Sequence, residues 1–257
     1  MNDMYKKEID LKTVYLEVLE ELKKEKAKKT LVIFYKEKDK PSKSFLKQIA
    51  KIATLLKVNI ILYKSNILFF DIIKIKHLNK KKNIDGILIL KPKDKSYKYT
   101  LRNKIIHKEK NVDNLENPNT TKATLYLLKK LNITKKEKIV ILGKGILTGL
   151  PLYNHLKEKQ YNVTLCDSKT PNIKNYTTKA DVLISAIGKP NYIDSSYIKE
   201  ESIVLSLGTS YKNKKYYSDL NEESLMKKAK LITPKINGMG LLTTIFLFKN
   251  LYKKETK

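Results

Sequence analysis

Glycines placed between a short apolar run and a helical pattern are the residues whose type and spacing best fit ligand chemistry. Gly143, Lys144 and Gly145 directly follow the apolar run 139–142. A helix that starts after such a turn presents backbone N–H groups without intrahelical partners, which can bind a phosphate or a ribose. The gap before the third glycine, Gly149, is one residue longer than in the common dinucleotide fingerprint. The turn alone therefore fits nucleotide binding and tight structural packing equally well.

An acidic residue follows the next expected strand, 162–166. Asp167 comes 24 residues after Gly143, near the position where an acid accepts hydrogen bonds from the adenosine ribose. A cap for the turn that follows is an equally good interpretation. The carboxylate would repel a 2′-phosphate, whereas Lys144 or Lys169 would attract one. The position of Asp167 slightly favours NAD over NADP, and we keep both cofactors as candidates.

Other reactive side chains form no pattern. The three histidines are scattered without metal-ligand spacing, so we expect no metal: they are His77, His107 and His155. No serine or cysteine nucleophile is paired with a histidine. Cys166, the only cysteine, cannot form an internal disulfide, which fits a reducing compartment.

The length and apolar content indicate a folded chain. It has 257 residues, 41% of them hydrophobic, which is enough for one large domain or two modest ones. No apolar run approaches the roughly 18 to 20 residues that a membrane span needs. The first residues, 1–6, lack a secretory apolar stretch. We expect a cytoplasmic protein with no membrane partner.

The net charge of +28 first suggests a polyanionic partner. However, Arg102 is the only arginine, and arginine is the residue that best forms forked contacts with bases and phosphates. The lysines are spread from end to end. We interpret the charge as compositional drift and expect no nucleic acid; a lysine-dependent nucleic-acid binder is the alternative, which a salt-dependent gel shift would reveal.

Short apolar runs alternate with helical patterns in two series. The first series has expected strands at 31–35, 59–63 and 85–90, helical patterns at 11–29 and 41–56, and an ambiguous segment at 72–78. The second has expected strands at 139–142, 162–166, 181–185, 203–207 and 231–233, and a last helix from about 242. A polar stretch without clear period, 93–119, separates them. This alternation predicts an α/β fold with a doubly wound, mostly parallel sheet.

Three segments carry a family resemblance. They are 143–151 (GKGILTGLP), 186–190 (AIGKP) and 232–243 (ITPKINGMGLLT). In this order and at these separations they resemble the methylenetetrahydrofolate dehydrogenase/methenyltetrahydrofolate cyclohydrolase family of the bifunctional FolD type. Three shorter elements are similar to the family's CHSKT, DGILVQLP and KDVDG: CDSKT at 166–170, DGIL at 85–88 and KNVD at 110–113. LGT at 207–209 resembles the family's glycine-containing strand end. The resemblance covers about residues 10 to 251, and all eight glycines fall within the matched elements.

The resemblance implies a fold and a set of ligands. The implied organisation is an N-terminal α/β folate domain, 1–119, and a Rossmann-like NAD(P)-binding domain, 120–241, with the C-terminal helix, 242–257, returning to the first domain. It also implies an active site between the domains, tetrahydrofolate derivatives as substrates, NAD or NADP as cofactor, and a homodimer. The implied reactions are hydride transfer from 5,10-methylenetetrahydrofolate to NAD(P)⁺, then addition of water to the methenyl product, giving 10-formyltetrahydrofolate.

The sequence departs from the family at the positions that carry proton transfer. Phe45 occupies the position of a tyrosine that packs on the folate, and it keeps the aromatic face. Ile49 occupies the position of the lysine that transfers protons, and Leu90 that of the glutamine hydrogen-bonded to it. Neither apolar side chain has a proton to give. The neighbouring Lys47 and Lys51 lie about 200° round the helix and are expected to point away.

The remaining family positions are largely kept. Asp113 matches the acid that contacts the pterin ring nitrogens, although a turn aspartate is the simpler interpretation. The last loop, at Asn237, Gly238 and Gly240, keeps two glycines of the folate-lining segment and loses both prolines. The cofactor contacts fall on Gly143, Lys144, Gly145, Asp167, Ser168 and Thr209.

Our leading hypothesis is a divergent methylenetetrahydrofolate dehydrogenase whose cyclohydrolase step is impaired or absent. Hydride transfer needs mainly placement of two ligands, whereas addition of water needs a proton-transfer group. Two alternatives remain. The full bifunctional activity could persist through another lysine, with Lys91 the outside candidate, or the chain could be a non-catalytic nucleotide-binding relative.

Overall fold

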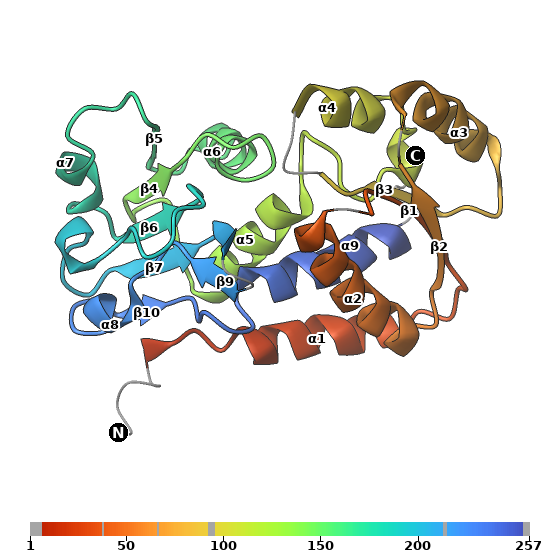
Figure 1. The fold of residues 1–257 in the computed structure, drawn as a ribbon. Helices are drawn as coiled ribbons and strands as arrows, with labels where there is room; N and C mark the ends of the chain where they lie inside the picture. The colour runs from red at the N-terminus through yellow and green to blue at the C-terminus, as the bar shows by residue number, and fades with distance from the viewer. Residues whose placement is uncertain (1–6, 38, 66, 92–95, 213–214, 254–257) are drawn as a thin grey trace. The chain divides into compact units, whose positions relative to one another are not determined.

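The computed structural model describes residues 7–37, 39–65, 67–91, 96–212 and 215–253. Their contacts divide the chain into two units, each with its own parallel sheet (Figure 1). Residues 16–119 and 244–253 form the three-stranded unit, and residues 7–15 and 120–243 form the five-stranded unit. Helices α1 (Leu11–Lys23) and α9 (Met239–Tyr252) each begin in the five-stranded unit and end in the three-stranded unit.

The three-stranded unit is built round a central apolar strand. β1 (Thr30–Tyr35) runs parallel to β2 (Asn59–Lys64) on one side and to β3 (Gly86–Ile89) on the other. The four residues 31–34 are at most 1% exposed, as is typical of a parallel strand covered on both faces. β2 forms an edge of the sheet, and most of its side chains are exposed. The helices that lie wholly in this unit are α2 (Lys40–Leu55), α3 (Leu68–Lys80), α4 (Ser96–Lys104) and the 3-10 turn Lys108–Lys110.

The start of α2 is set by local chemistry. The side chain of Asp39, just before the helix, accepts a hydrogen bond from the Ser42 N–H at 3.0 Å, which satisfies one of the donors that a helix start leaves unpaired. A proline in the first turn supplies the backbone angle the helix needs. Phe45 and Ile49 then follow one helical turn apart, so they share a face of α2.

The five-stranded unit is doubly wound. Its strands are β4 (Ile139–Leu142), β5 (Val163–Cys166), β6 (Val182–Ser185), β7 (Ile203–Ser206) and β10 (Leu231–Ile232). All pair in parallel, in the order β10-β7-β6-β4-β5. The chain passes from β4 to β5 on one side and then returns to β6 on the other side of β4. The order therefore reverses between β4 and β6, which is where such sheets bind their ligands.

Helices and one hairpin complete this unit. The helices are α5 (Asn119–Lys130), α6 (Gly149–Glu158), α7 (Lys174–Thr177), α8 (Glu222–Leu225) and the 3-10 turn Ser195–Tyr197. The antiparallel hairpin pairs β8 (Thr209–Lys212) with β9 (Lys215–Ser218). One face of the sheet packs a core of buried apolar side chains that includes Val140, Leu183, Val204 and Ile232.

The predicted α/β class with a doubly wound parallel sheet is confirmed. Local patterns were weaker where polar residues form helices. The ambiguous segment 72–78 lies within α3, and the polar stretch 93–119 contains α4 and a 3-10 turn. In α4 only a few side chains are buried, among them Tyr99 and Arg102, so it lacks the broad apolar face that periodicity detects.

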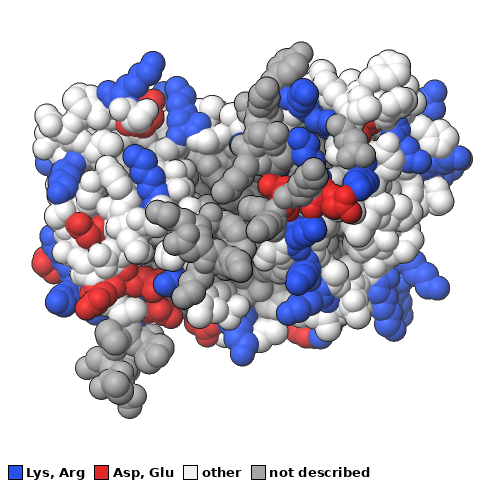
Figure 2. Space-filling model, in the orientation of Figure 1, with Lys and Arg blue, Asp and Glu red and all other residues white. Residues whose placement is uncertain are grey.

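Two further features are the distribution of charged side chains and the length of the apolar helices. Figure 2 shows lysine and arginine side chains distributed over the visible face, with acidic and uncharged residues between them. Within the described residues no helix is both long and apolar enough to span a membrane.

Candidate functional site

The glycine turn lies at the carboxyl end of β4, at the point where the strand order reverses. The Gly143 N–H donates to the Cys166 carbonyl at 2.8 Å, which ties the turn to the neighbouring β5. Gly143 has φ +103°, and a Cβ there would lie 2.6 Å from the Ala186 carbonyl oxygen. A Cβ at Gly149 would overlap the Gly143 carbonyl. Both positions therefore require glycine for this close turn.

The turn leads directly into α6, which begins at Gly149. Thr148, at the cap position, makes no side-chain hydrogen bond to the first turn of the helix. At the helix start the Leu150 N–H donates to the Gly145 carbonyl at 3.2 Å, and Pro151 has no N–H. The Gly149 N–H is therefore the candidate donor of this helix start to an anionic group. Lys144 is exposed and Gly145 half-buried at the same turn. These residues fit the phosphates of a dinucleotide.

Asp167 follows β5 and caps the turn after it. Its Oδ1 accepts from the Lys169 N–H at 2.9 Å and from the Thr170 hydroxyl at 3.4 Å. The hydrogen bond from the Lys169 backbone is the main cause that lowers the pKa of this carboxyl, and Lys144 adds to it electrostatically. Both of these hydrogen bonds fall on Oδ1, so Oδ2 can still accept from a ribose hydroxyl. The cap and the cofactor contact are thus compatible.

The other predicted cofactor contacts are less well defined. Ser168 is exposed beside Asp167. Thr209 begins β8, and its side chain lies outside the described residues.

A carboxylate that the sequence did not mark lies at the same edge of the sheet. Asp219 is 0% exposed, and its Oδ2 accepts from the Ser185 hydroxyl at 2.7 Å. The same oxygen accepts from the N–H groups of Ile187 at 3.1 Å and Gly188 at 3.2 Å. Asp219 comes after a tyrosine-rich hairpin in which no local pattern distinguishes a buried acid from a turn residue.

The predicted folate-side residues of the three-stranded unit sit on α2, β3 and the loop before α5. Ile49 is 0% exposed and Phe45 half-buried on α2. Leu90, just after β3, is 7% exposed, and its N–H donates to the Phe34 carbonyl at 2.9 Å. Lys47 and Lys51 are both exposed on α2, as expected, and Lys91 is exposed after β3.

Asp113 is held by asparagines. Its carbonyl accepts from the Asn103 side chain at 2.9 Å, and its Oδ1 accepts from the Asn119 N–H at 2.8 Å. The Asn119 side chain in turn accepts from the Asn250 amide of α9 at 2.5 Å. The Tyr99 hydroxyl is buried without a hydrogen-bond partner among the described residues. Burial, with the nearby charge of Asp113, raises the pKa of Tyr99.

The last loop belongs to the five-stranded unit. Asn237 adopts a left-handed conformation, φ +55°. A Cβ at Gly238 would lie 2.6 Å from the Pro234 carbonyl oxygen, whereas a Cβ at Gly240 would meet nothing within 4 Å. Packing within this unit therefore explains the glycine at 238 and leaves the one at 240 free of any steric requirement.

Comparisons with known proteins decide the family. The family described as tetrahydrofolate dehydrogenase/cyclohydrolase, NAD(P)-binding domain, matches residues 118–257. A bifunctional protein FolD from Clostridium perfringens is 36% identical over 197 residues, which cover 71% of each chain. The chain belongs to the tetrahydrofolate dehydrogenase/cyclohydrolase family. The resemblance predicted from the sequence is confirmed, and the cofactor is NAD or NADP.

Solved structures of this family share the fold across almost the whole chain. A FolD dehydrogenase/cyclohydrolase from Campylobacter jejuni is 25% identical with a TM-score of 0.85, covering 94% of this chain and 95% of that one. A Trypanosoma brucei FolD complexed with NADP cofactor and inhibitor is 22% identical with a TM-score of 0.86, covering 95% of each chain. The three-stranded unit, most of which lies outside the matched NAD(P)-binding segment, therefore also has the family's fold.

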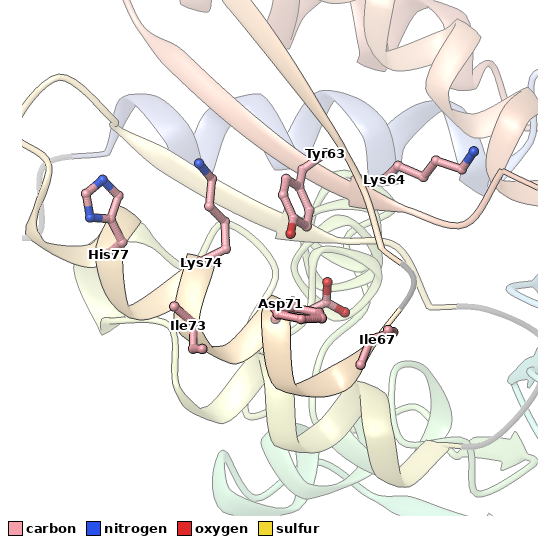
Figure 3. Close-up of a pocket in the computed structure, with 8 residues that line it drawn as sticks. Tyr63, Lys64, Ile67, Asp71, Ile73, Lys74 and His77 are labelled. Atoms are coloured by element: carbon pink, nitrogen blue, oxygen red, sulfur yellow. The ribbon is translucent and has the colours of Figure 1, made fainter.

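A pocket of about 510 Å³ lies apart from every residue predicted for this family's site. It is lined by Tyr63 and Lys64 of β2 and by side chains of α3 and the residue before it, among them Ile67, Phe70 and Asp71 (Figure 3). The same region carries most of the exposed large apolar residues of the three-stranded unit. They are Ile61, Leu62, Ile67, Phe69, Phe70 and Ile73, and we call them the β2–α3 face.

Proposed function

We propose that this protein is an NAD(P)-dependent methylenetetrahydrofolate dehydrogenase whose cyclohydrolase step is impaired or absent. The observation that carries the proposal is Ile49, an apolar and fully buried side chain at the position where the family has its proton-transferring lysine. Leu90 replaces the glutamine partner of that lysine. Because both members of the pair are apolar, this chain provides neither the proton-transfer group nor the side chain that would orient it.

The two steps of the family place different demands on the protein. In the first, a hydride leaves the methylene carbon of 5,10-methylenetetrahydrofolate, and bound NAD(P)⁺ supplies the acceptor. No side chain has to accept a proton, so placement of the two ligands is the main requirement. In the second, water adds to the methenyl carbon and must lose a proton, a step to which a positioned group contributes about 10²- to 10⁴-fold.

The chain still offers the groups that placement of the two ligands needs. Phe45 offers an aromatic face for the pterin. Asp113 offers a carboxylate that Asn119 orients through a backbone hydrogen bond. The glycine turn at 143–149 offers backbone amides to the cofactor. Gly238 and the adjoining Asn237 and Gly240 offer close backbone approach to the folate.

The deciding experiment assays both steps on one preparation. We expect the purified protein to form methenyltetrahydrofolate from methylenetetrahydrofolate and NAD(P)⁺, and to hydrolyse methenyltetrahydrofolate no faster than buffer. Absorbance of the methenyl product reports both steps. Rapid hydrolysis by the wild-type protein would contradict the split assignment.

A pair of lysine variants tests the alternative that the protein keeps full bifunctional activity through another lysine. Lys91 is exposed two residues after the end of β3, next to the position of the lost glutamine. Suppose that the wild-type protein does hydrolyse methenyltetrahydrofolate. If Lys91 then replaces the lost proton-transferring lysine, Lys91→Met should abolish this hydrolysis. Lys47→Met is the control, because Lys47 is exposed on the same helix as Ile49 but two residues away.

The non-catalytic alternative makes a different prediction. A non-catalytic relative that binds nucleotides would bind the dinucleotide without forming the methenyl product, whereas an interaction protein that kept only the fold would bind neither folate nor dinucleotide. Titration calorimetry with each ligand measures this directly. Binding of both ligands without formation of the methenyl product would also favour that alternative.

We also propose a homodimer, in which the β2–α3 face of one copy packs on that of another. β2 is an edge strand of its sheet, and edges of this kind pair readily with another chain. Antiparallel pairing centred on Ile61 would set Ile61 opposite Ile61 of the second copy, and Asn59 opposite Tyr63. No like charges would then face each other, as a two-fold contact requires.

A further inference from the structure

Asp219 ties together the chain at the carboxyl ends of two parallel strands. It follows β9 in sequence, yet its Oδ2 accepts three hydrogen bonds from the end of β6, contributed by Ser185, Ile187 and Gly188. Its own N–H donates to the Ser206 hydroxyl of β7 at 3.3 Å. That hydroxyl donates to the Gly208 carbonyl at 3.0 Å. Asp219 thus holds the end of β6 through its buried carboxylate and the end of β7 through its backbone N–H.

The loop that Asp219 holds faces the glycine turn across the point where the strand order reverses. Gly188 has φ +68°, and both N–H groups that point to Asp219 come from this loop. The Ala186 carbonyl stands so close to Gly143 that a Cβ there would lie 2.6 Å away. A shift of the 186–188 loop would therefore alter the space between this loop and the glycine turn, where the strand order reverses.

The carboxylate also explains a glycine. A Cβ at Gly208 would overlap the carboxylate oxygens of Asp219. The requirement for glycine at 208 is thus steric. Oδ1 of Asp219 is buried with no hydrogen-bond partner among the described residues. A buried oxygen without a hydrogen bond lowers the stability of the fold. Core packing alone therefore does not explain why an aspartate occupies position 219.

The direction of a bound dinucleotide follows from the topology. Asp167, at the end of β5, marks the adenosine side, and the start of α6 receives the pyrophosphate. The nicotinamide half then extends over the ends of β6 and β7, on the other side of β4. These are the two strand ends that Asp219 braces.

We propose that Asp219 is a positioning residue, which holds the 186–188 loop in the conformation that receives the nicotinamide half of NAD(P). The inference rests on the proposed function for its ligand. It assigns to Asp219 no contact with the cofactor and no proton transfer.

The test compares a whole dinucleotide with its adenosine half. Titration calorimetry measures the Kd of NAD⁺ and of ADP for the wild-type protein and for Asp219→Ala, with NADP⁺ and 2′-phospho-ADP used instead if NADP⁺ binds more tightly. We expect Asp219→Ala to raise the Kd of NAD⁺ about tenfold or more and that of ADP less than twofold. Asp219→Asn, which keeps an acceptor oxygen, should return the Kd of NAD⁺ to within about threefold of the wild type.

A purely structural role predicts another pattern. If Asp219 only stabilised the unit, Asp219→Ala would weaken both ligands alike, and that result would overturn the proposal. An unchanged Kd of NAD⁺ would overturn it too. Should Asp219→Ala fail to fold, Ser185→Ala removes one donor to the carboxylate, and the same two-ligand comparison decides. Asp194→Asn, which removes another aspartate of this unit, is the control and should change neither Kd.

Failure of the proposed function gives a different result. A wild-type protein that binds NAD⁺ without oxidising methylenetetrahydrofolate would contradict the dehydrogenase assignment alone, because the comparison of the two ligands needs no turnover. A wild-type protein that binds neither dinucleotide would contradict both.

Discussion

At the residue scale, two aspartates at the ends of parallel strands illustrate how burial decides a role. Asp167 is partly exposed after β5, with one oxygen committed to its own turn. Asp219 is fully buried, and its carboxylate accepts hydrogen bonds from a loop more than 30 residues earlier in the chain. Asp167 can therefore contact a ligand, whereas Asp219 can only hold the chain segments beside it.

Asp167 predicts the choice between the two cofactors. We expect kcat/KM with NAD⁺ to exceed that with NADP⁺ about tenfold, because the carboxylate repels a 2′-phosphate. Asp167→Asn keeps an acceptor for the Lys169 N–H and removes the charge, so it should narrow the preference. Since the pKa of Asp167 is already lowered in the wild type, the carboxylate stays ionised, and the preference should stay constant from about pH 7 to pH 8, above the second pKa of a phosphate group, about 6.

The control for this measurement is Asp194→Asn. Asp194 accepts from the Ser196 N–H at 2.8 Å in a comparable turn of the same unit, so its loss changes the net charge equally. A wild-type preference for NADP⁺, or an equal effect of both variants, would contradict the role given to Asp167.

At the element scale, the only arginine of the chain joins two helices. Arg102 of α4 donates through Nε to Asp71 of α3 at 2.6 Å, and its Nη2 lies 2.5 Å from the same oxygen. The Ser65 hydroxyl donates to that oxygen as well, at 2.6 Å. Arg102 is 4% and Asp71 1% exposed. The arginine thus serves the fold and is unavailable to a nucleic acid.

Breaking this pair should be costly. Arg102→Met leaves Asp71 buried without its cation, and we expect a loss of about 3 to 5 kcal/mol in the free energy of unfolding, measured by urea denaturation. The double variant Asp71→Leu with Arg102→Met should be more stable than Arg102→Met alone, because apolar replacement of both partners removes the unpaired charge.

A surface pair provides the comparison. Lys23 and Glu20 form an exposed ion pair on α1 at 2.8 Å, and Lys23→Met should cost about 1 kcal/mol or less. Equal losses from Lys23→Met and Arg102→Met would show that burial does not give the Asp71–Arg102 pair its importance.

At the scale of the whole molecule, the surface combines a large positive charge with one apolar region. The chain carries a net charge of +28, which opposes association of copies unless the contact is low in charge. The β2–α3 face has exposed aromatic and aliphatic residues on an edge strand and the helix after it. Contiguous apolar regions of this kind usually mark an interaction surface.

We expect light scattering to give twice the 29.8 kDa mass of the single chain. Phe70→Asp places a charge within the β2–α3 face, where Phe70 is 56% exposed, and should yield the single-chain mass. Ile236→Asp is the control, because Ile236 is 77% exposed and lies in the five-stranded unit. A wild-type protein that already has the single-chain mass would contradict the dimer.

The class of fold and the family could both be predicted from the order of residues in the chain. Strands such as 139–142 and 203–206 are short, apolar and buried on both faces, so their composition alone distinguishes them from the helices between them. The glycine turn after β4 was visible for a similar reason, since a strand, a turn and a helix adjoin in the chain. Features made of residues that adjoin in the chain can be predicted because the sequence contains all of their parts side by side.

The partners of the buried polar groups became visible only in the folded chain. Asp219 with the 186–188 loop, Arg102 with Asp71, and Asn119 with Asn250 are pairs far apart in the sequence. Nothing in the periodicity of a helix or strand specifies such a partner. Burial makes these partners necessary, because a carboxylate that is removed from water must accept hydrogen bonds from other groups of the protein. In the sequence such an acid looks the same as an exposed turn residue.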